Sequence, residues 1–419
     1  MTQARPRHGP GGLAWMLIGR LTMTAATAAL MLLCALVFMD EATFGVFSTC
    51  IGAQLVLSRG VLLGLDSSVV RLHTAAQDRI EPVRAAVSIA GTLGLAALLL
   101  GAILAPSQPR GMRWELILAV AFGAVGSAWF DLGCAVVLAR LRYRAAGLLT
   151  AAMPTIRLGV TLAACVATHD DSLLPSIAFS AATFAAGVVL LVTVARRFGW
   201  HAGRAMFWRE LQYTKWIGMS DAATVLSIYV GLFVLLSRQF ADAAGRYAFG
   251  LQLMQGMLAV FLAFYQSLLP RAARLGGLDS LPVFLRDGFR TAVKLALVCA
   301  VGAALCASIV PMVLQSVRPG LVGFGPAFLG LSIFVIVLMF EAPLGVTCQF
   351  LLRPQLQLLA LCVRAATILV CGMWLIPARQ DLGAGIAQAI GGTAGLVALF
   401  VLVRRAIEAE RRRQACAAS

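Results

Sequence analysis

Residues 86–105 read AVSIAGTLGLAALLLGAILA, a run of twenty residues without one acidic or basic side chain. At about 1.5 Å of rise per residue, a helix of this length crosses the roughly 30 Å hydrocarbon core of a bilayer. The whole chain has the same character: 60% of its 419 residues are hydrophobic, 12% are charged, and the mean hydropathy is +0.89. Soluble domains carry about 25% charged residues, so the sequence predicts a membrane protein.

Eleven further segments resemble this one in length and polarity, and helices are the spans that such a pattern allows in lipid. The twelve predicted spans are 14–39, 44–65, 86–105, 116–139, 145–167, 173–194, 216–236, 247–269, 290–314, 327–350, 356–377 and 382–403. The connections average about 14 residues, too short to bury a core of their own. We therefore expect an all-α integral membrane transporter rather than an enzyme, without an attached nucleotide-binding domain.

The basic residues are distributed unevenly between the two sides of the predicted membrane. The net charge is +16, and 32 of the 34 basic residues are arginine. Alternate connections hold 23 basic residues on the side of both termini and six on the other side. Because basic connections stay in the cytoplasm, both termini are expected there, with Asp40, Asp170 and Asp381 outside. The basic runs then serve orientation and contact with anionic lipids rather than nucleic-acid binding.

Features of the first half recur about 200 residues later in the same order. Gly45 corresponds to Gly245 at an offset of 200, and Arg157 corresponds to Arg364 at 207. This order indicates a duplication, and six spans per half give parallel repeats around a central cavity, which suits alternating access. The predicted parts are an N-terminal six-helix lobe (1–194), a basic cytoplasmic linker helix (195–215), a C-terminal six-helix lobe (216–403) and a basic cytoplasmic tail (404–419).

Some ionisable residues fall inside the predicted spans. Each costs ~2.5–3.5 kcal/mol at a helix centre, so we expect them to face a polar interior. One of them, Lys294, lies near a span end and can extend its ammonium group to the interface. The eight residues are Arg20, Arg59, Asp131, Arg157, Asp221, Lys294, Glu341 and Arg364.

Two interpretations of the deepest four charges are open. Glu341 and Arg364 lie at equal depths on adjacent antiparallel spans, and Asp131 and Arg157 are their counterparts in the first half. Either each lobe holds an internal ion pair, or these charges line the cavity unpaired. Arg59 has no acidic neighbour at comparable depth in its own hairpin, so we expect it to be unpaired and the first candidate for a substrate contact.

A gate is a further hypothesis. At the offset of 200, Arg20 aligns with position 220, one residue from Asp221. Arg20 and Asp221 would then form an ion pair between the lobes when the cytoplasmic side is closed. The alternative is that each side chain faces local water or headgroups.

Histidine and cysteine offer little other site chemistry. The four histidines lie outside the spans without metal-ligand spacing, so neither a metal nor a cofactor is expected; they are His8, His73, His169 and His201. Nine of the ten cysteines lie in or at the edges of spans, where they serve as small packing residues.

Several short stretches resemble the signatures of one known family, the polysaccharide-biosynthesis oligosaccharide flippases. That family belongs to the multidrug/oligosaccharidyl-lipid/polysaccharide exporter superfamily, which also holds the multidrug and toxin extrusion transporters. The resemblance covers nearly the whole chain in order. The stretches are Phe44–Phe47 (FGVF), Leu63–Asp66 (LGLD), Val70-Arg71, Gly245–Tyr247 (GRY) leading to Leu268–Arg271 (LLPR), and Leu382–Ala387 (LGAGIA).

The resemblance implies a flippase of the bacterial inner membrane. Its cargo would be an undecaprenyl-diphosphate-linked oligosaccharide for a surface polysaccharide such as exopolysaccharide or O-antigen, handled beside a polymerase and glycosyltransferases. Arginines suit a diphosphate because their fork of donors matches its oxygens. The candidate substrate-binding residues are Arg59, Arg20, Arg157 and Arg364, and the candidate gating or coupling residues are Asp221, Asp131 and Glu341. Relatives often carry an aspartate near 227–231, which this chain lacks.

Two other functions stay open. A multidrug or small-cation antiporter of the same superfamily would favour a negative cavity, whereas the eight buried groups, five positive and three negative, sum to +2. An integral-membrane glycosyltransferase or polymerase would be expected to carry a long extramembrane loop with carboxylates, and the sequence has none. A flippase with no nucleic-acid partner is therefore the preferred prediction.

Overall fold

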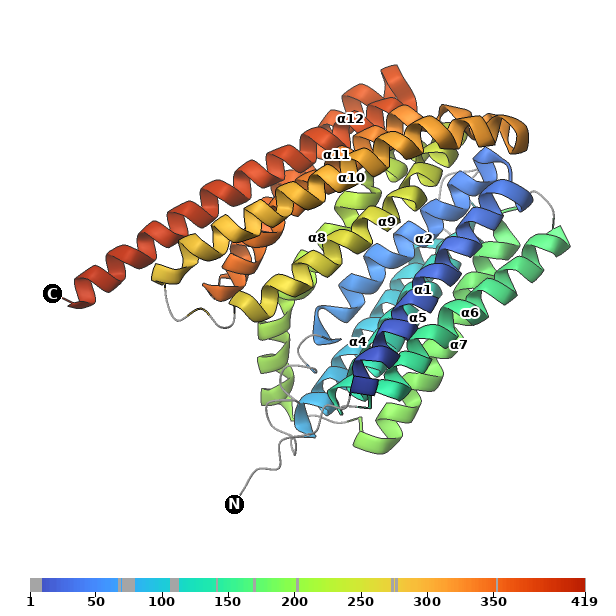
Figure 1. Ribbon diagram of the computed structural model, residues 1–419. Helices are drawn as coiled ribbons and strands as arrows, with labels where there is room; N and C mark the ends of the chain where they lie inside the picture. The colour runs from blue at the N-terminus through green and yellow to red at the C-terminus, as the bar shows by residue number, and fades with distance from the viewer. Residues whose placement is uncertain are drawn as a thin grey trace. The chain divides into compact units, whose positions relative to one another are not determined.

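The computed structural model describes residues 10–66, 69, 80–105, 113–140, 142–168, 171–200, 203–272, 275, 278–351 and 353–418. Within these ranges the chain is built of helices, and eleven of them are long and apolar enough to cross a membrane (Figure 1). The prediction of an all-helical, multi-pass membrane protein is confirmed.

The helices follow one another with short connections. The first seven are α1 (Pro10–Leu33), which continues as a π-helical segment over Cys34–Phe38, α2 (Glu41–Leu62), α4 (Glu81–Leu104), α5 (Trp114–Ala139), α6 (Tyr143–Thr168), α7 (Leu173–Phe198) and α8 (Arg204–Ser237). The last four are α9 (Ala241–Ala272), α10 (Leu281–Val317), α11 (Gly325–Phe350) and α12 (Pro354–Ala418), with short 3-10 turns at Leu278–Ser280 and Pro319–Phe324.

Three helix boundaries differ from the prediction. The linker is not a separate surface helix: α7 ends at Gly199, which has a φ of 91°, and Arg204 already belongs to α8. Residues 204–217 contain neither glycine nor proline, so nothing stops the helix before the membrane. The last two predicted spans form one element, α12, which reverses at Gln380 with a φ of 47° and also takes in the predicted tail.

Contacts divide the chain into two compact units. The first consists of Met1–Phe38 and Cys50–Ala222, and the second of Met39–Thr49 and Ala223–Ser419. Compared with the predicted lobes, the first turns of α2 group with the second unit, and the first unit extends into α8. Each unit is described by itself below.

In the first unit, α5 is the central helix, and 67% of its span is buried. It packs against α4 and α7, while α1 packs against α6. The indole of Trp129 on α5 donates to the Ala90 carbonyl of α4 at 2.9 Å. A Cβ at Gly126 would lie 2.6 Å from the backbone nitrogen of Phe184, so only glycine permits this crossing of α5 and α7.

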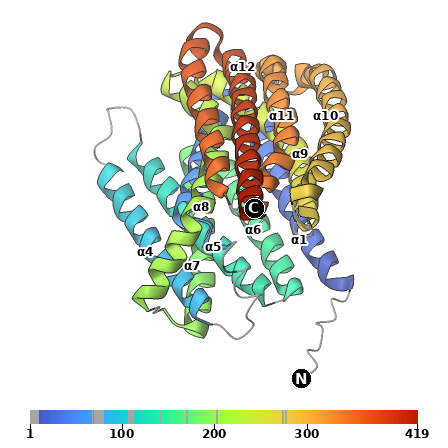
Figure 2. The same cartoon turned by 90° about the vertical axis from the view of Figure 1, so that its left-hand side faces the viewer.

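In the second unit, α11 packs against α9, α10 and α12, and the last three helices lie side by side in Figure 2. Only 17% of the α10 span is buried. Its Val293, Leu297, Val301 and Leu305 are exposed at intervals of four residues. A continuous apolar stripe of this kind is a lipid-facing surface.

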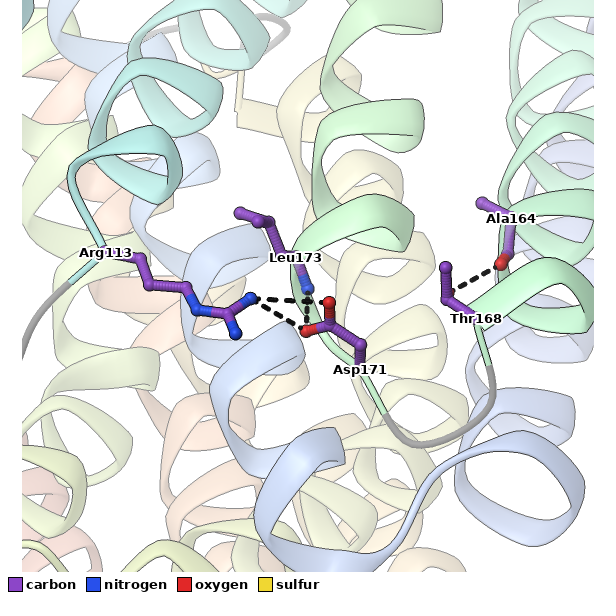
Figure 3. Close-up of polar contacts among 5 residues, drawn as sticks. All are labelled: Arg113, Ala164, Thr168, Asp171 and Leu173. Carbon is purple, nitrogen blue, oxygen red and sulfur yellow. Dashed lines mark hydrogen bonds and ion pairs between the residues drawn. The ribbon is translucent and has the colours of Figure 1, made fainter.

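One end of the first unit is held by an ion pair beside the start of α7 (Figure 3). The Arg113 Nη1 atom lies 3.1 Å from Asp171 Oδ1, which also accepts a hydrogen bond from the Leu173 amide at 3.0 Å. The carboxylate thus satisfies a free amide of the first turn of α7. Both side chains are about half exposed, so the role of Asp171 is local and structural.

Candidate functional site

A charge cluster lies around Arg59, near the end of α2, in the first unit. Its Nη2 atom lies 3.4 Å from Asp131 Oδ2 on α5, and its Nη1 atom lies 3.9 Å from Asp66 Oδ2. Asp221 on α8 also interacts electrostatically with Arg59 and Asp66. The prediction that Arg59 is unpaired is wrong. Asp66 follows it by two helical turns on the same face, and α5 supplies the other partner from outside the hairpin.

Arg157 of α6 is bound by neutral groups. Its Nε atom donates to Thr183 Oγ1 at 2.7 Å, and its Nη2 atom donates to Ser127 Oγ at 3.1 Å. The guanidinium also lies over the ring of Phe179, 4.6 Å from the centroid. Among the described residues Arg157 makes no ion pair, and Asp131 acts on it only at longer range. The predicted Asp131–Arg157 pair is therefore wrong, because hydroxyls on α5 and α7 lie closer to the guanidinium.

Buried hydroxyl groups of α7 connect with this arginine. Ser176, Ser180 and Thr183 lie on one face of α7, and the Gln54 side chain of α2 donates to Ser180 Oγ at 2.5 Å. The outer oxygen of Gln54 and the Ser176 hydroxyl are buried without a hydrogen-bond partner. The sequence analysis missed this polar face. Its signal was the spacing of hydroxyl residues at i, i+4 and i+7 in an otherwise apolar span.

The second unit holds the other predicted pair. The Arg364 Nη2 atom of α12 donates to Glu341 Oε2 of α11, which confirms the pairing predicted from equal depth. The side chains are only 2% and 10% exposed. Arg364 also lies 5.5 Å from the Phe334 ring centroid, and a Cβ at Gly395 would lie 2.9 Å from its Nε atom. This enclosed arrangement is typical of a structural ion pair.

The remaining candidates are less constrained. Arg20 on α1 is exposed and Asp221 is half-buried, and both belong to the first unit. A pair between them would therefore lie within one unit instead of joining two lobes, and it stays a prediction. Lys294 on α10 is exposed. The described residues include no cluster of three or more His, Cys, Asp or Glu suited to a metal, and the four histidines lie outside them.

The fold is that of the membrane transporters and lipid flippases of the MOP superfamily. The lipid II flippase MurJ in an inward closed conformation aligns with a TM-score of 0.66 and 11% identity, covering 93% of this chain and 87% of that chain. An inward-facing multidrug resistance MATE family transporter gives a TM-score of 0.62 and 13% identity, covering 96% and 99%. MATE in complex with MaL6 gives 0.61 and 15%, covering 96% and 97%.

No family model matches the sequence, and no curated relative does. At 11–15% identity the structural likeness defines the fold alone. The superfamily expected from the sequence signatures is thus the one in which this fold occurs, while the oligosaccharide flippase branch stays a prediction.

Proposed function

We propose that the chain is an alternating-access flippase of the bacterial inner membrane, which moves a polyprenyl-diphosphate-linked oligosaccharide to the outer leaflet. The observation that carries this proposal is the environment of Arg157. Two hydroxyls and an aromatic ring hold its guanidinium, and no carboxylate neutralises it at close range. A cation positioned in this way attracts an anion, and its free donors match the oxygens of a diphosphate.

The fold neighbours are transporters and a flippase, which supports a transporter over an enzyme. Both termini would lie in the cytoplasm, as the distribution of basic residues predicts. Polymerase and glycosyltransferase partners would supply and consume the cargo. Arg59 and Arg20 remain candidate contacts for the same headgroup, whereas Arg364 is committed to Glu341.

A second candidate function rests on the carboxylates around Arg59. With all groups ionised, Asp66, Asp131 and Asp221 outweigh Arg59 and Arg157 by one negative charge. The net positive sum of the eight buried groups therefore does not describe the first unit. A multidrug or small-cation antiporter would use such a site, and a MATE-like fold suits that function equally well.

The experiment that separates the two candidates is transport by the purified chain in proteoliposomes. Arg157→Gln should slow translocation of a labelled polyprenyl-diphosphate oligosaccharide at least about tenfold, since a hydrogen bond to a charged group contributes about 1.5–3 kcal/mol. Arg157→Lys should keep part of the activity, and the exposed control Lys294→Gln should keep all of it. Movement of a cationic dye that Arg157→Gln leaves unchanged, without lipid translocation, would select the antiporter.

A further inference from the structure

A groove of about 280 Å³ lies in the second unit between α10, α11 and α12, three helices that lie side by side in Figure 1. Its lining is apolar in the part contributed by all three helices and charged along the end of α12. The apolar residues are Leu285 and Phe289 of α10, Leu344 of α11, and Phe400, Val403 and Ile407 of α12. The charged residues are Arg404, Glu408 and Arg411.

The groove crosses the level at which α12 changes from apolar to basic. The predicted span ends at residue 403, and the arginines begin at Arg404. From Phe400 to Arg411 the helix rises about 16 Å, compared with about 5–8 Å for the headgroup zone on each side of a bilayer. An occupant of the whole groove therefore needs an apolar part beside Phe400 and a polar part beside the arginines. A membrane lipid has this form.

The charges of the groove favour an anionic lipid. Arg404 is paired with Glu408, with 3.0 Å between Nε and Oε1. The other carboxylate of this segment, on Glu410, lies 3.6 Å from Arg353 Nη2. Among the described residues Arg411 has no ion-pair partner, so the groove keeps a net charge of +1. A phosphate oxygen would supply the missing partner.

The walls of the groove are fixed before any ligand binds. Because α12 reverses at Gln380, its beginning and its last turns lie together, and the Arg353–Glu410 pair connects them. Leu344 and Val403 belong to the buried apolar core beneath the groove. A site formed in this way loses little conformational entropy on binding.

We propose that this groove binds one anionic phospholipid from the leaflet on the side of the C-terminus. Its phosphate lies at Arg404 and Arg411, and an acyl chain lies against Phe289, Leu344 and Phe400. The site is separate from the charge cluster of the first unit, and its occupancy does not depend on which cargo the protein transports.

The test compares lipid binding by the purified full chain in nanodiscs and by native mass spectrometry. The probes are phosphatidylglycerol and phosphatidylcholine. The groove variant is Arg404→Gln with Arg411→Gln, and the matched control is Arg405→Gln with Arg412→Gln, which removes the same charge from neighbouring positions outside the groove. We expect wild type and control to retain one phosphatidylglycerol per chain, and the groove variant to bind it at least about tenfold more weakly.

A steric variant separates the groove from its charges. Leu285→Trp narrows the apolar part while every arginine stays, and it should also release the lipid. Equal loss in the groove and control variants would show diffuse electrostatic attraction and overturn the proposal. So would equal retention of phosphatidylcholine by wild type, or a second copy of the chain in place of the lipid in the mass spectrum.

Discussion

Replacing Arg364 with methionine should destabilise the protein by about 3–5 kcal/mol, because it leaves the Glu341 carboxylate buried without a counter-charge. The surroundings offer no substitute partner. Glu341 Oε1 is already buried without a hydrogen bond in the native protein, and the other carboxylate oxygen depends on Arg364 Nη2. Glu341→Leu should cost a similar amount, since it leaves the guanidinium enclosed by Phe334 and Gly395.

The double variant Glu341→Leu with Arg364→Met removes both charges at similar volume. Replacing a buried ion pair by apolar side chains is often neutral or stabilising, so the double variant should lie within about 2 kcal/mol of wild type. The coupling free energy between the two sites should then be at least about 2 kcal/mol.

The assay is reversible unfolding of the purified chain in mixed micelles titrated with a denaturing detergent, followed by tryptophan fluorescence. Lys294→Met is the control, and because this lysine is exposed it should change stability by less than about 0.5 kcal/mol. A double variant as unstable as the worse single variant would refute the reasoning, because the two side chains would then contribute independently.

Three further predictions concern the first unit. Gly126→Leu should cost at least about 1–3 kcal/mol of stability in the same assay, because its side chain meets the α7 backbone, whereas Gly159→Leu, which faces open space, should be tolerated; equal effects would contradict the close crossing. A reporter fused after Asp171 should be active only on the outer side of the membrane; cytoplasmic activity would contradict the orientation. Arg20→Asp and Asp221→Arg should each impair transport in proteoliposomes and the double exchange should recover part of it; no recovery would exclude their pairing.

The sequence predicted those features of the fold that follow from polarity and length. Long uncharged segments located the spans, and equal depth on neighbouring antiparallel helices predicted the Glu341–Arg364 pair. The same reasoning could not predict that the linker continues into α8 or that α12 takes in the tail, since hydropathy locates the part of a helix in lipid and not where the helix ends.

The contacts of the first-unit site were harder to predict, because they depend on how helices pack. Arg59 pairs with Asp131 because α2 and α5 bring them together across 72 positions of the chain, and no periodicity within one hairpin contains that information. Asp66 belonged to a recognised signature, yet its place beside Arg59 followed only from the structure. Arg157 was identified as buried, but its hydroxyl partners on other helices were not.

The most direct test of the proposed function is whether the diphosphate itself selects the cargo. Proteoliposomes containing the wild-type chain would be loaded with one labelled oligosaccharide carried either on a polyprenyl diphosphate or on an uncharged polyprenyl ether. An impermeant lectin would then measure how fast each sugar crosses the bilayer. The account predicts at least about tenfold faster translocation of the diphosphate-linked form, as expected for a charge-assisted contact to Arg157. Equal rates for the two carriers, or transport of a lipophilic cation with neither oligosaccharide moved, would contradict it.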